Sequence, residues 1–441
     1  MIKIIFHQIK NQKRLNGWIF VELLVVSIFL WLVIDPLYVL LSNRLIPAGY
    51  EQEGLYSVSI GKYAATHPRF SQEANADSIL RNNYSHQLNI LRQMPEVESY
   101  CIASNYSIPS CGAWNGGQLA TDTAETSRDS RVHVQRFETA RYLDGDIFRT
   151  YRIIDVHTGE ILRPDADVRK IYIVAYTARL LFGTTDVVGR TVFQGKDKVE
   201  IGGVFSDIKY ADYEQPFPLE IIMSAGLKKE MDADYWKWRY CFVFRLKEGV
   251  DASAFVRRFN AEVVPTLAIG NWYCCGLRSF ADWSREFARQ SGVSNKLRLQ
   301  FALSGFSIFC IFLGMLGTFW IRTKTRRQEI GLMRSMGASR GTIVRQFLTE
   351  CWLLMTLAFI FALVVVGAYV YLEGMTVGSF MDMGHTMSSN NPIYWQNQAL
   401  PHFFLVTIIT YVLLLVVALI GTMIPVSQAV NSLPAEALRE E

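Results

Sequence analysis

Charged side chains are concentrated between residues 322 and 350, where the spacing favours binding over catalysis. This stretch carries Arg322, Lys324, Arg326, Arg327, Arg334, Arg340 and Arg345 against only Glu329 and Glu350. An excess of cationic groups with few carboxylates could bind an anionic lipid surface or a complementary face of a protein partner. The order of charged and apolar residues along this stretch decides between these two interpretations.

Nucleotide chemistry needs a loop that this sequence lacks. Hydrolysis of ATP requires backbone amides around the phosphates, together with a Lys and a Ser or Thr on Mg²⁺, in the pattern G-x-x-x-x-G-K-[ST]. The pair Gly61-Lys62 is followed by Tyr63, and Gly195-Lys196 is followed by Asp197. We therefore expect no catalytic activity and no bound cofactor in this chain, with ATP and Mg²⁺ bound by a separate subunit.

Histidine and cysteine offer little further chemistry. The seven histidines are scattered without the paired spacing of metal ligands, so we expect no metal site. Seven cysteines are present, and Cys101 and Cys111 could close a short loop as a disulfide in an oxidising compartment. Buried free thiols are the equal alternative.

The elements that position these residues include four membrane spans. Half of the 441 residues are hydrophobic and only 19% are charged, against roughly 25% in a soluble protein. The excess lies in four runs, each long enough to cross about 30 Å of hydrocarbon. They cover residues 18–41, 301–321, 351–372 and 403–425, and we interpret the first as an uncleaved anchor. The net charge of +4 is too small for a simple nucleic-acid-binding protein.

The distribution of Lys and Arg predicts the orientation of the spans. Residues 1–17 carry four cations and no carboxylate, and the 322–350 loop is strongly basic, whereas the 373–402 loop has no Lys or Arg. Because cationic loops are retained in the cytoplasm, both of these basic segments and the tail 426–441 are predicted to be cytoplasmic. The large region 42–300 and the short loop 373–402 are then exported.

The exported region has the pattern of an α+β domain. Strands are predicted at 54–60 and 97–103 around a helix at 77–94, and again at 240–246 and 275–280 around a helix at 252–264. Two such units predict one split βαβ layer with an inserted, mainly-β subdomain at about 131–206. A hairpin is predicted at 190–204, with Gly195-Lys196 at its turn.

The cytoplasmic loop also has a defined local pattern. Residues 329–336 can form a short amphipathic helix with Ile330, Met333 and Met336 on one side. Gly337-Ala338 can end this helix, because Gly tolerates left-handed geometry, and Ser339 can cap the helix that leads into the third span.

Three segments make the chain resemble the MacB/FtsX-type permeases of ABC transporters, which are of the mechanotransmission type. The segments are RRQEIGLMRSMGASRGTIVRQFLTE at 326–350, the tail PAEALRE at 434–440, and LLFGTTDVVGRTVF at 180–193 followed by VEIGGVFSDI at 199–208. The resemblance implies a porter-like βαβ layer with a sabre-like insert. It also implies that the short cytoplasmic helix couples to an ATPase subunit of the MacB, LolD or FtsE kind. The implied coupling residues are Arg326, Arg327, Glu329, Ile330, Gly331, Met333, Arg334, Met336, Gly337 and Ala338.

The same resemblance implies the assembly and its location. Two permease chains, identical or different, would pair through their first two spans in the bacterial inner membrane, with helical stalks running outward from residue 41 and inward along 284–299. MacB-like members resemble efflux machines for peptides, antibiotics or lipophilic substrates, which work with a periplasmic adaptor and an outer-membrane channel. FtsX-like control of an envelope enzyme and LolC/LolE-like lipoprotein extraction are the alternatives. A membrane-anchored scaffold would not explain the ordered cytoplasmic helix.

Small and ionisable residues within the spans are candidates for helix packing and for ion pairing. Ser304, Gly305, Gly314 and Gly317 are small residues that allow close helix packing, either between chains or within one chain. Glu22 and Asp35 lie near the two ends of the first span, where snorkelling to the interface or pairing at a helix end is favoured over an ion pathway.

Overall fold

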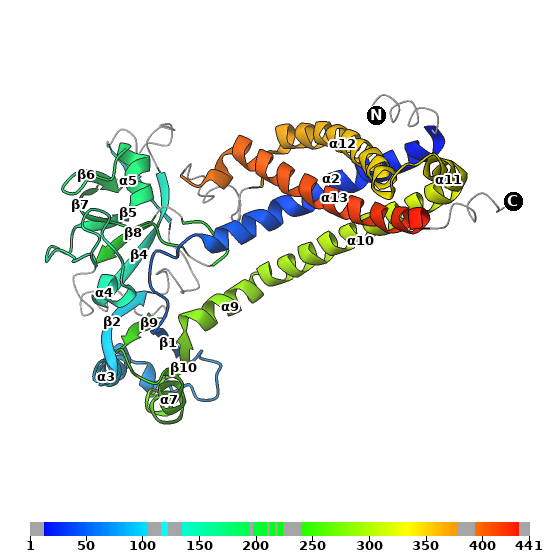
Figure 1. Cartoon of the computed structure of the whole chain (residues 1–441). Coiled ribbons are helices and arrows are strands. Elements are labelled where there is room, and N and C mark those ends of the chain that lie inside the picture. Colours follow the sequence, from blue (N-terminus) through cyan, green and yellow to red (C-terminus); the bar gives the residue numbers. More distant parts are fainter. Residues whose placement is uncertain are drawn as a thin grey trace. The chain divides into compact units, whose positions relative to one another are not determined.

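The computed structural model describes residues 13–104, 116–121, 135–194, 197–209, 212–216, 219–223, 240–376 and 393–431 (Figure 1). The chain divides into a helical unit and an α+β unit. The helical unit takes Met1–Ser42, Ser294–Val377 and Pro392–Glu441, and most of the α+β unit is Asn43–Val293.

Four long helices confirm the four predicted spans. They are α2 (Lys13–Leu45), α10 (Val293–Thr325), α12 (Arg340–Glu373) and α13 (Ala399–Asn431), and each is long and apolar enough to cross a membrane. All four extend beyond their apolar runs, because polar residues with good helix propensity continue the same hydrogen-bond ladder. A short helix, α11 (Arg327–Ser335), follows α10.

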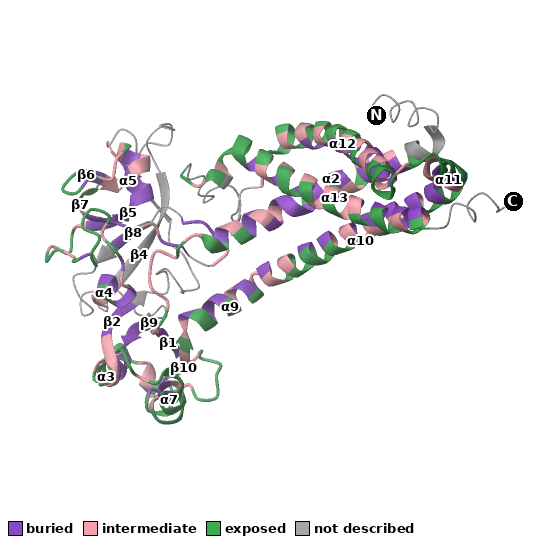
Figure 2. Cartoon of the chain, in the orientation of Figure 1, coloured by how far each residue is buried: buried purple, intermediate pink, exposed green. Residues whose placement is uncertain are grey.

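The helical unit has an apolar interior and an apolar exterior. Trp31, Phe319, Phe347 and Leu414, one from each long helix, are almost fully buried in one cluster. Other large apolar side chains point outward, among them Phe306 and Val364 with about two thirds of their surface exposed, and exposed and buried residues alternate along the helices (Figure 2). This distribution suits helices that face lipid on one side and each other on the other side.

The first part of the α+β unit confirms the predicted split βαβ layer. Its antiparallel sheet has the order β10-β1-β9-β2. The elements are β1 (Leu55–Lys62), α3 (Asp77–Arg92), β2 (Val97–Ser104), β9 (Tyr240–Leu246), α7 (Ala252–Arg258) and β10 (Trp272–Ser279). A π-helical turn (Phe259–Val263) and α8 (Val264–Thr266) continue α7. Helix α3 buries Leu80, Tyr84, Leu88 and Leu91, at the three- and four-residue spacing of one helical face, against this sheet.

The inserted part is a closed ring of strands and contains two helices that the sequence pattern did not predict. Its strands pair in the order β4-β3-β6-β7-β5-β8, and a parallel β4–β8 pairing closes the ring. The strands are β3 (Gly116–Ala120), β4 (Gln135–Gly145), β5 (Ile171–Val174), β6 (Thr191–Gln194), β7 (Asp197–Phe205) and β8 (Leu219–Met223). The predicted hairpin is confirmed as β6–β7, and its turn residues 195 and 196 lie outside the described residues. The helices are α4 (Ile147–Tyr151) and α5 (Ala175–Phe182).

The third sequence motif explains why α5 begins and ends where it does. The Asp207 carboxylate, just after β7, accepts hydrogen bonds from the Tyr176 amide (2.7 Å) and the Arg179 guanidinium (3.0 Å). Burial raises the pKa of Asp207, and these two donors oppose that rise. Gly183 has a φ of +70° and ends the helix in left-handed geometry. The motif residues therefore join α5 to the sheet.

The inner stalk differs from its prediction. Helix α9 (Phe280–Gln290) ends before α10 begins at Val293. Gly292, with a φ of +78°, interrupts the helix that was expected to run without a break over 284–299.

Candidate functional site

The short helix predicted at 329–336 forms as α11. Helix α11 ends at Ser335, and Gly337 follows with a φ of +93°. The Ser339 hydroxyl accepts a hydrogen bond from the Thr342 amide and so caps α12. These local signals fix α11 as a separate short helix between two long ones.

One face of α11 is packed and the other is open. Ile330 is buried in the helical core and Met333 packs partly against it, which confirms two of the three predicted apolar contacts. Met336 differs from the prediction, because 72% of its surface is exposed beyond the end of the helix. Leu332 is also exposed (53%), one turn earlier. Together with Gln328 and Ser335 these two residues form an exposed surface, which we call the α11 outer face.

A buried ion network ties the start of α11 to α10 and α12. The Glu350 carboxylate, almost fully buried, accepts hydrogen bonds from Arg322 Nη1 (2.7 Å) and Arg326 Nη1 (3.2 Å). Arg326 also contacts Glu329 with two nitrogens, at 2.7 and 3.2 Å. Its guanidinium lies over the Phe347 ring at 4.9 Å. The network therefore holds α11 to the ends of two spans, and Arg326 faces inward instead of toward a partner.

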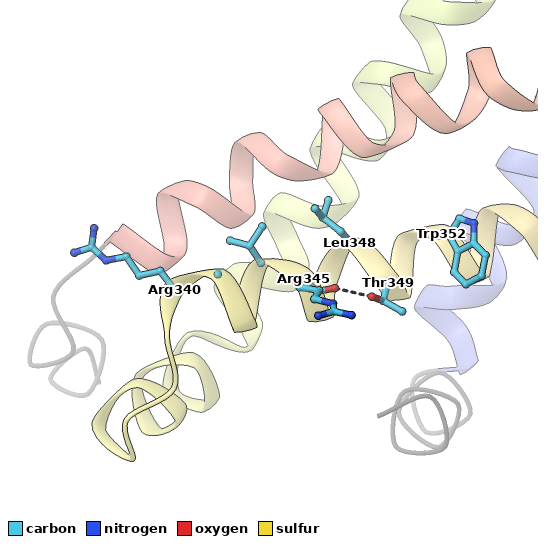
Figure 3. A pocket seen from close by; sticks show the side chains of 7 residues that line it. Arg340, Arg345, Leu348, Thr349 and Trp352 are labelled. Atoms are coloured by element: carbon cyan, nitrogen blue, oxygen red, sulfur yellow. Dashed lines mark hydrogen bonds between the residues drawn. The ribbon is translucent and has the colours of Figure 1, made fainter.

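The other end of α11 is tied to α13. Arg334 Nη1 donates a 2.7 Å hydrogen bond to the Val430 carbonyl oxygen, and Arg340 Nη1 donates to Asn431 Oδ1 at 3.1 Å. The last carbonyls of a helix lack intrahelical donors and carry partial negative charge, so cations at this position stabilise them. Figure 3 shows Arg340 at the start of α12, next to the end of α13.

The predicted coupling residues thus divide into two groups. Arg326, Ile330 and Gly331 are buried, and Met333, Arg334 and Ala338 are half-buried with contacts inside the chain. Glu329, Met336 and Gly337 are exposed, and Arg327 is half-buried. The pairing of Arg322 with Glu350 was not predicted from the sequence, although both residues lie at the boundary between a span and the basic loop.

The predicted small residues of α10 lie beside a groove. The groove has a volume of about 640 Å³ and is lined by Trp18, Val21, Glu22, Val25, Leu313 and Ile321, among others, from α2 and α10. A Cβ added at Gly314 would overlap the Glu22 carboxylate, whereas Gly305 and Gly317 have no neighbour within 4 Å among the described residues. Ser304 is buried. A glycine that packs against the backbone of another helix is Gly421 of α13, whose added Cβ would lie 3.1 Å from the Phe312 carbonyl oxygen.

The first span has a polar contact near its outer end. Asp35 Oδ1 lies 2.9 Å from His402 Nε2 on α13, and its other oxygen accepts a hydrogen bond from the Thr376 hydroxyl. Both Asp35 and His402 are buried. Pairing was the favoured interpretation of Asp35, and a buried pair joins the two helices without a continuous polar path.

A buried lysine holds the end of α2 within the α+β unit. Lys209 Nζ donates hydrogen bonds to the carbonyl oxygens of Asn43 (2.7 Å), Ile46 (3.0 Å) and Asp212 (2.8 Å). Burial lowers the pKa of Lys209 to about 8, and burial raises the pKa of nearby Glu214 to about 7. The ammonium group satisfies carbonyls at the end of the helix and so fastens α2 to the loop after β7.

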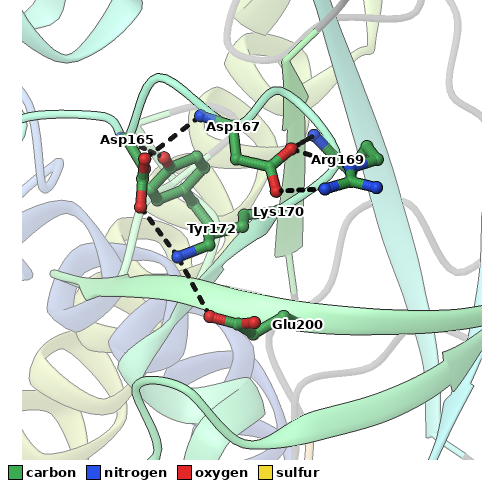
Figure 4. A network of polar contacts seen from close by, with 6 residues as sticks. All are labelled: Asp165, Asp167, Arg169, Lys170, Tyr172 and Glu200. Carbon is green, nitrogen blue, oxygen red and sulfur yellow. Dashed lines mark hydrogen bonds and ion pairs between the residues drawn. The ribbon is translucent and has the colours of Figure 1, made fainter.

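A cluster of charged side chains orders a turn in the α+β unit. In Figure 4 Lys170 bridges Asp165 (2.7 Å) and Glu200 (3.0 Å), while Arg169 pairs with Asp167. These contacts order the turn before β5.

The predicted disulfide between Cys101 and Cys111 stays a prediction, because Cys111 lies outside the described residues. Cys101 is buried, which raises the pKa of its thiol. No group of three or more His, Cys, Asp or Glu side chains in the described ranges could hold a metal ion.

Comparison with known proteins identifies the C-terminal part. Residues 301–434 match the family described as FtsX-like permease C-terminal. This match includes α11 and most of α10, α12 and α13, and it runs into the tail motif at 434–440, which lies outside the described residues. No curated protein sequence matches the chain significantly.

Three solved structures are similar to parts of the chain at low identity. A domain of a putative permease protein from Porphyromonas gingivalis has 14% identity and a TM-score of 0.32, covering 53% of this chain and 94% of its own. The periplasmic region of MacB from Actinobacillus actinomycetemcomitans has 11% identity and a TM-score of 0.32, covering 55% and 94%. The extracellular domain of the noncanonic ABC-type transporter YknZ from Gram-positive bacteria has 11% identity and a TM-score of 0.29, covering 50% and 100%.

Proposed function

From the match of residues 301–434 to the FtsX-like permease C-terminal family, we propose that the chain is the membrane subunit of an ABC transporter driven by a separate ATPase chain. The proposal places α11 at the ATPase, and the spans and the α+β unit on the path of the movement. It also places the chain in the bacterial inner membrane with both termini in the cytoplasm, which the basic segments support.

The observation that carries the proposal is the construction of α11. The helix is fixed to three spans by Arg326, Glu350 and Arg334, yet it leaves Leu332 and Met336 open on its outer face. Exposed apolar side chains one turn apart, with the polar Gln328 and Glu329 beside them, suit insertion into a groove on a protein partner. A helix that is attached rigidly on one side and exposed on the other can bind a partner on its exposed face and transmit the movement of that partner to the spans.

The buried contacts offer a route for that push. Displacement of α11 would act on α12 through Arg326 and Glu350, on α10 through Glu350 and Arg322, and on α13 through Arg334. Helix α10 follows α9 out of the α+β unit, and α2 enters that unit at the Lys209 contact. Among the described residues of the spans, the buried ionisable groups are paired near the ends, which supports transmission of force better than passage of substrate through the bilayer.

On the exported side, the movement would act on a substrate or on a partner protein. We favour extrusion of a peptide, an antibiotic or another lipophilic substrate, with a periplasmic adaptor and an outer-membrane channel as further partners. The large inserted ring of strands supports this choice, because it provides a surface beyond the βαβ layer. FtsX-like control of an envelope enzyme and LolC/LolE-like lipoprotein extraction are the alternatives, and crosslinking of the α+β unit to its neighbour would distinguish them.

A second permease chain, identical or different, would cover the groove between α2 and α10. The groove is apolar except for Glu22 and Thr318, and Gly305 and Gly317 leave α10 open to close approach. In a Cys-free background, Val25→Cys should crosslink two chains in native membranes, whereas Val364→Cys, which lies on α12 and is equally apolar, should not. The reverse result would place the interface elsewhere.

Co-purification from native membranes tests the coupling role. The wild-type chain should bring down an ATPase subunit, and the pair Leu332→Asp with Met336→Asp should lose it, because two charges would have to be buried in the partner's groove. Ile79→Asp, at an exposed apolar residue of α3, is the matched control and should retain it. Recovery of no ATPase with the wild type, or equal recovery with the double variant, would refute the proposal.

A further inference from the structure

One face of α12 forms an open groove next to the start of the helix. The groove has a volume of about 530 Å³ and is lined by Arg340, Val344, Arg345, Leu348, Thr349 and Trp352, among others. Residues 340, 344, 348 and 352 follow the four-residue spacing of one helical face, and Figure 3 shows these side chains along the helix. The groove therefore combines a basic end with an apolar end.

The groove runs from the edge of the apolar run outward past the layer of lipid headgroups. The apolar run of this span begins at Cys351, so Arg345 lies about 9 Å outside it by helical rise, and Trp352 lies at its edge. Headgroup layers are on the order of 5–8 Å thick on each side of the hydrocarbon. An Arg side chain at this position reaches the phosphate layer, and Trp is favoured at the boundary itself.

The two arginines in the groove have unused donors. Arg322, Arg326 and Arg334 are occupied by Glu350, Glu329 and Val430. In contrast, Arg345 is exposed, and its guanidinium has no hydrogen bond or ion pair within the described residues. Arg340 uses one nitrogen for Asn431 and keeps its other donors, since a guanidinium has five N–H groups. Two cations in one groove, about 7.5 Å apart along the helix axis and without a carboxylate among the lining residues, call for an anionic ligand.

The apolar end is fixed in a shape that fits a hydrocarbon chain. The Trp352 indole donates a 3.1 Å hydrogen bond to the Tyr411 hydroxyl, which holds the ring, and 40% of the ring is exposed. Along the helix, Leu348 lies between Arg345 and Trp352, and Val344 lies between the two arginines. An ordered aromatic ring next to aliphatic side chains offers a surface for glycerol and acyl carbons.

We propose that this groove binds one anionic phospholipid of the cytoplasmic leaflet, with Arg345 at its phosphate, with Arg340 at the outer part of its headgroup, and with its acyl chain along Leu348 and Trp352. The complementary charge of the ligand and the depth of the groove select a lipid over a soluble anion. The inference depends on the predicted membrane orientation and is independent of ATPase docking.

Native mass spectrometry of the full chain in detergent, with phosphatidylglycerol added, tests the proposal. A cation near an anionic membrane surface contributes on the order of fivefold in affinity, so Arg340→Gln with Arg345→Gln should weaken binding about thirtyfold. The matched control is Lys324→Gln with Arg327→Gln, which removes the same charge from the same loop and should bind phosphatidylglycerol like the wild type. Arg345→Gln alone leaves the Arg340–Asn431 contact intact and should weaken binding about fivefold, which separates loss of the site from loss of folding.

The remaining arms distinguish the other occupants. Phosphatidylcholine should bind the wild type much less than phosphatidylglycerol, and soluble glycerol phosphate should not compete. Equal loss of lipid in both double variants would reduce the effect to general charge and overturn the site. Full competition by glycerol phosphate would assign the groove to a soluble anion. Unchanged phosphatidylglycerol binding in the groove variants would overturn the proposal and leave the groove to a protein partner.

Discussion

Replacing Glu350 with Gln removes the carboxylate that Arg322 and Arg326 share. Arg326 retains Glu329, but Arg322, which is 1% exposed, would have no counter-charge among the described residues. Removing one member of a buried ion pair costs about 3–5 kcal/mol, because the remaining charge stays desolvated. Gln keeps an acceptor for one hydrogen bond, so we expect about 3 kcal/mol, near the lower end.

The double variant Arg322→Met with Glu350→Leu separates charge from packing. It removes both members of the pair and leaves Arg326 with Glu329, so its stability should lie within about 1 kcal/mol of the wild type. Glu373→Gln, at the exposed opposite end of α12, is the control and should change stability by less than about 0.5 kcal/mol.

Reversible unfolding of the full chain in mixed micelles, followed by circular dichroism, measures these differences. The expected order of stability is wild type and control together, the double variant close to them, and Glu350→Gln clearly below. If Glu350→Gln matches the control, the pair contributes nothing measurable. If the double variant is less stable than Glu350→Gln, the pair is a net source of stability, and the reasoning from desolvation is wrong.

Three further predictions test other contacts. Arg334→Met removes the bond to the Val430 carbonyl, so hydrogen exchange of the α11 amides should accelerate by an amount that corresponds to about 1.5–3 kcal/mol, whereas Arg327→Met should have a smaller effect. Glu214 has a pKa of about 7 in the folded protein against an ordinary 4.5, so between these two pH values the folded state binds a proton that the unfolded state has lost. This proton contributes up to about 3 kcal/mol to the free energy of unfolding. The contribution is fully present below pH 4.5 and is lost as the pH rises through 7. Denaturant titrations at pH 5 and pH 8 should show this loss for the wild type beyond that of Glu214→Gln, and equal pH dependence in both would contradict it. Gly421→Leu should cost about 1–3 kcal/mol because its side chain meets the α10 backbone, while Gly367→Leu, with no neighbour within 4 Å, should be nearly neutral in the same unfolding assay.

The features that the sequence predicted are those that depend on nearby residues. The four spans follow from continuous apolar runs, and the end of α11 follows from Gly337 and Ser339. Strand β9 was predicted with its observed bounds, because alternating and aromatic residues mark it. The split βαβ layer followed from the repetition of one local pattern.

The missed features depend on residues far apart in the chain. Arg322 and Glu350 pair only because the last turns of α10 meet the first part of α12, and Asp35 meets His402 across most of the sequence. Helix α5 follows β5 without a break, so no polar turn signalled the change of period. The closure of the ring by β4 and β8 depends on a parallel pairing between strands that carry no local signal for it.

The point where the insertion leaves the βαβ layer has a consequence for how such permeases diversify. Ser104, the last residue of β2, pairs with Tyr240, the first residue of β9, so the chain departs and returns at a single rung of the sheet. Residues between them, apart from the end of β4 that pairs with β2, can change length or sequence while the register of that rung is kept. The inserted segment is therefore suited to exchange between related proteins without a change in the βαβ layer.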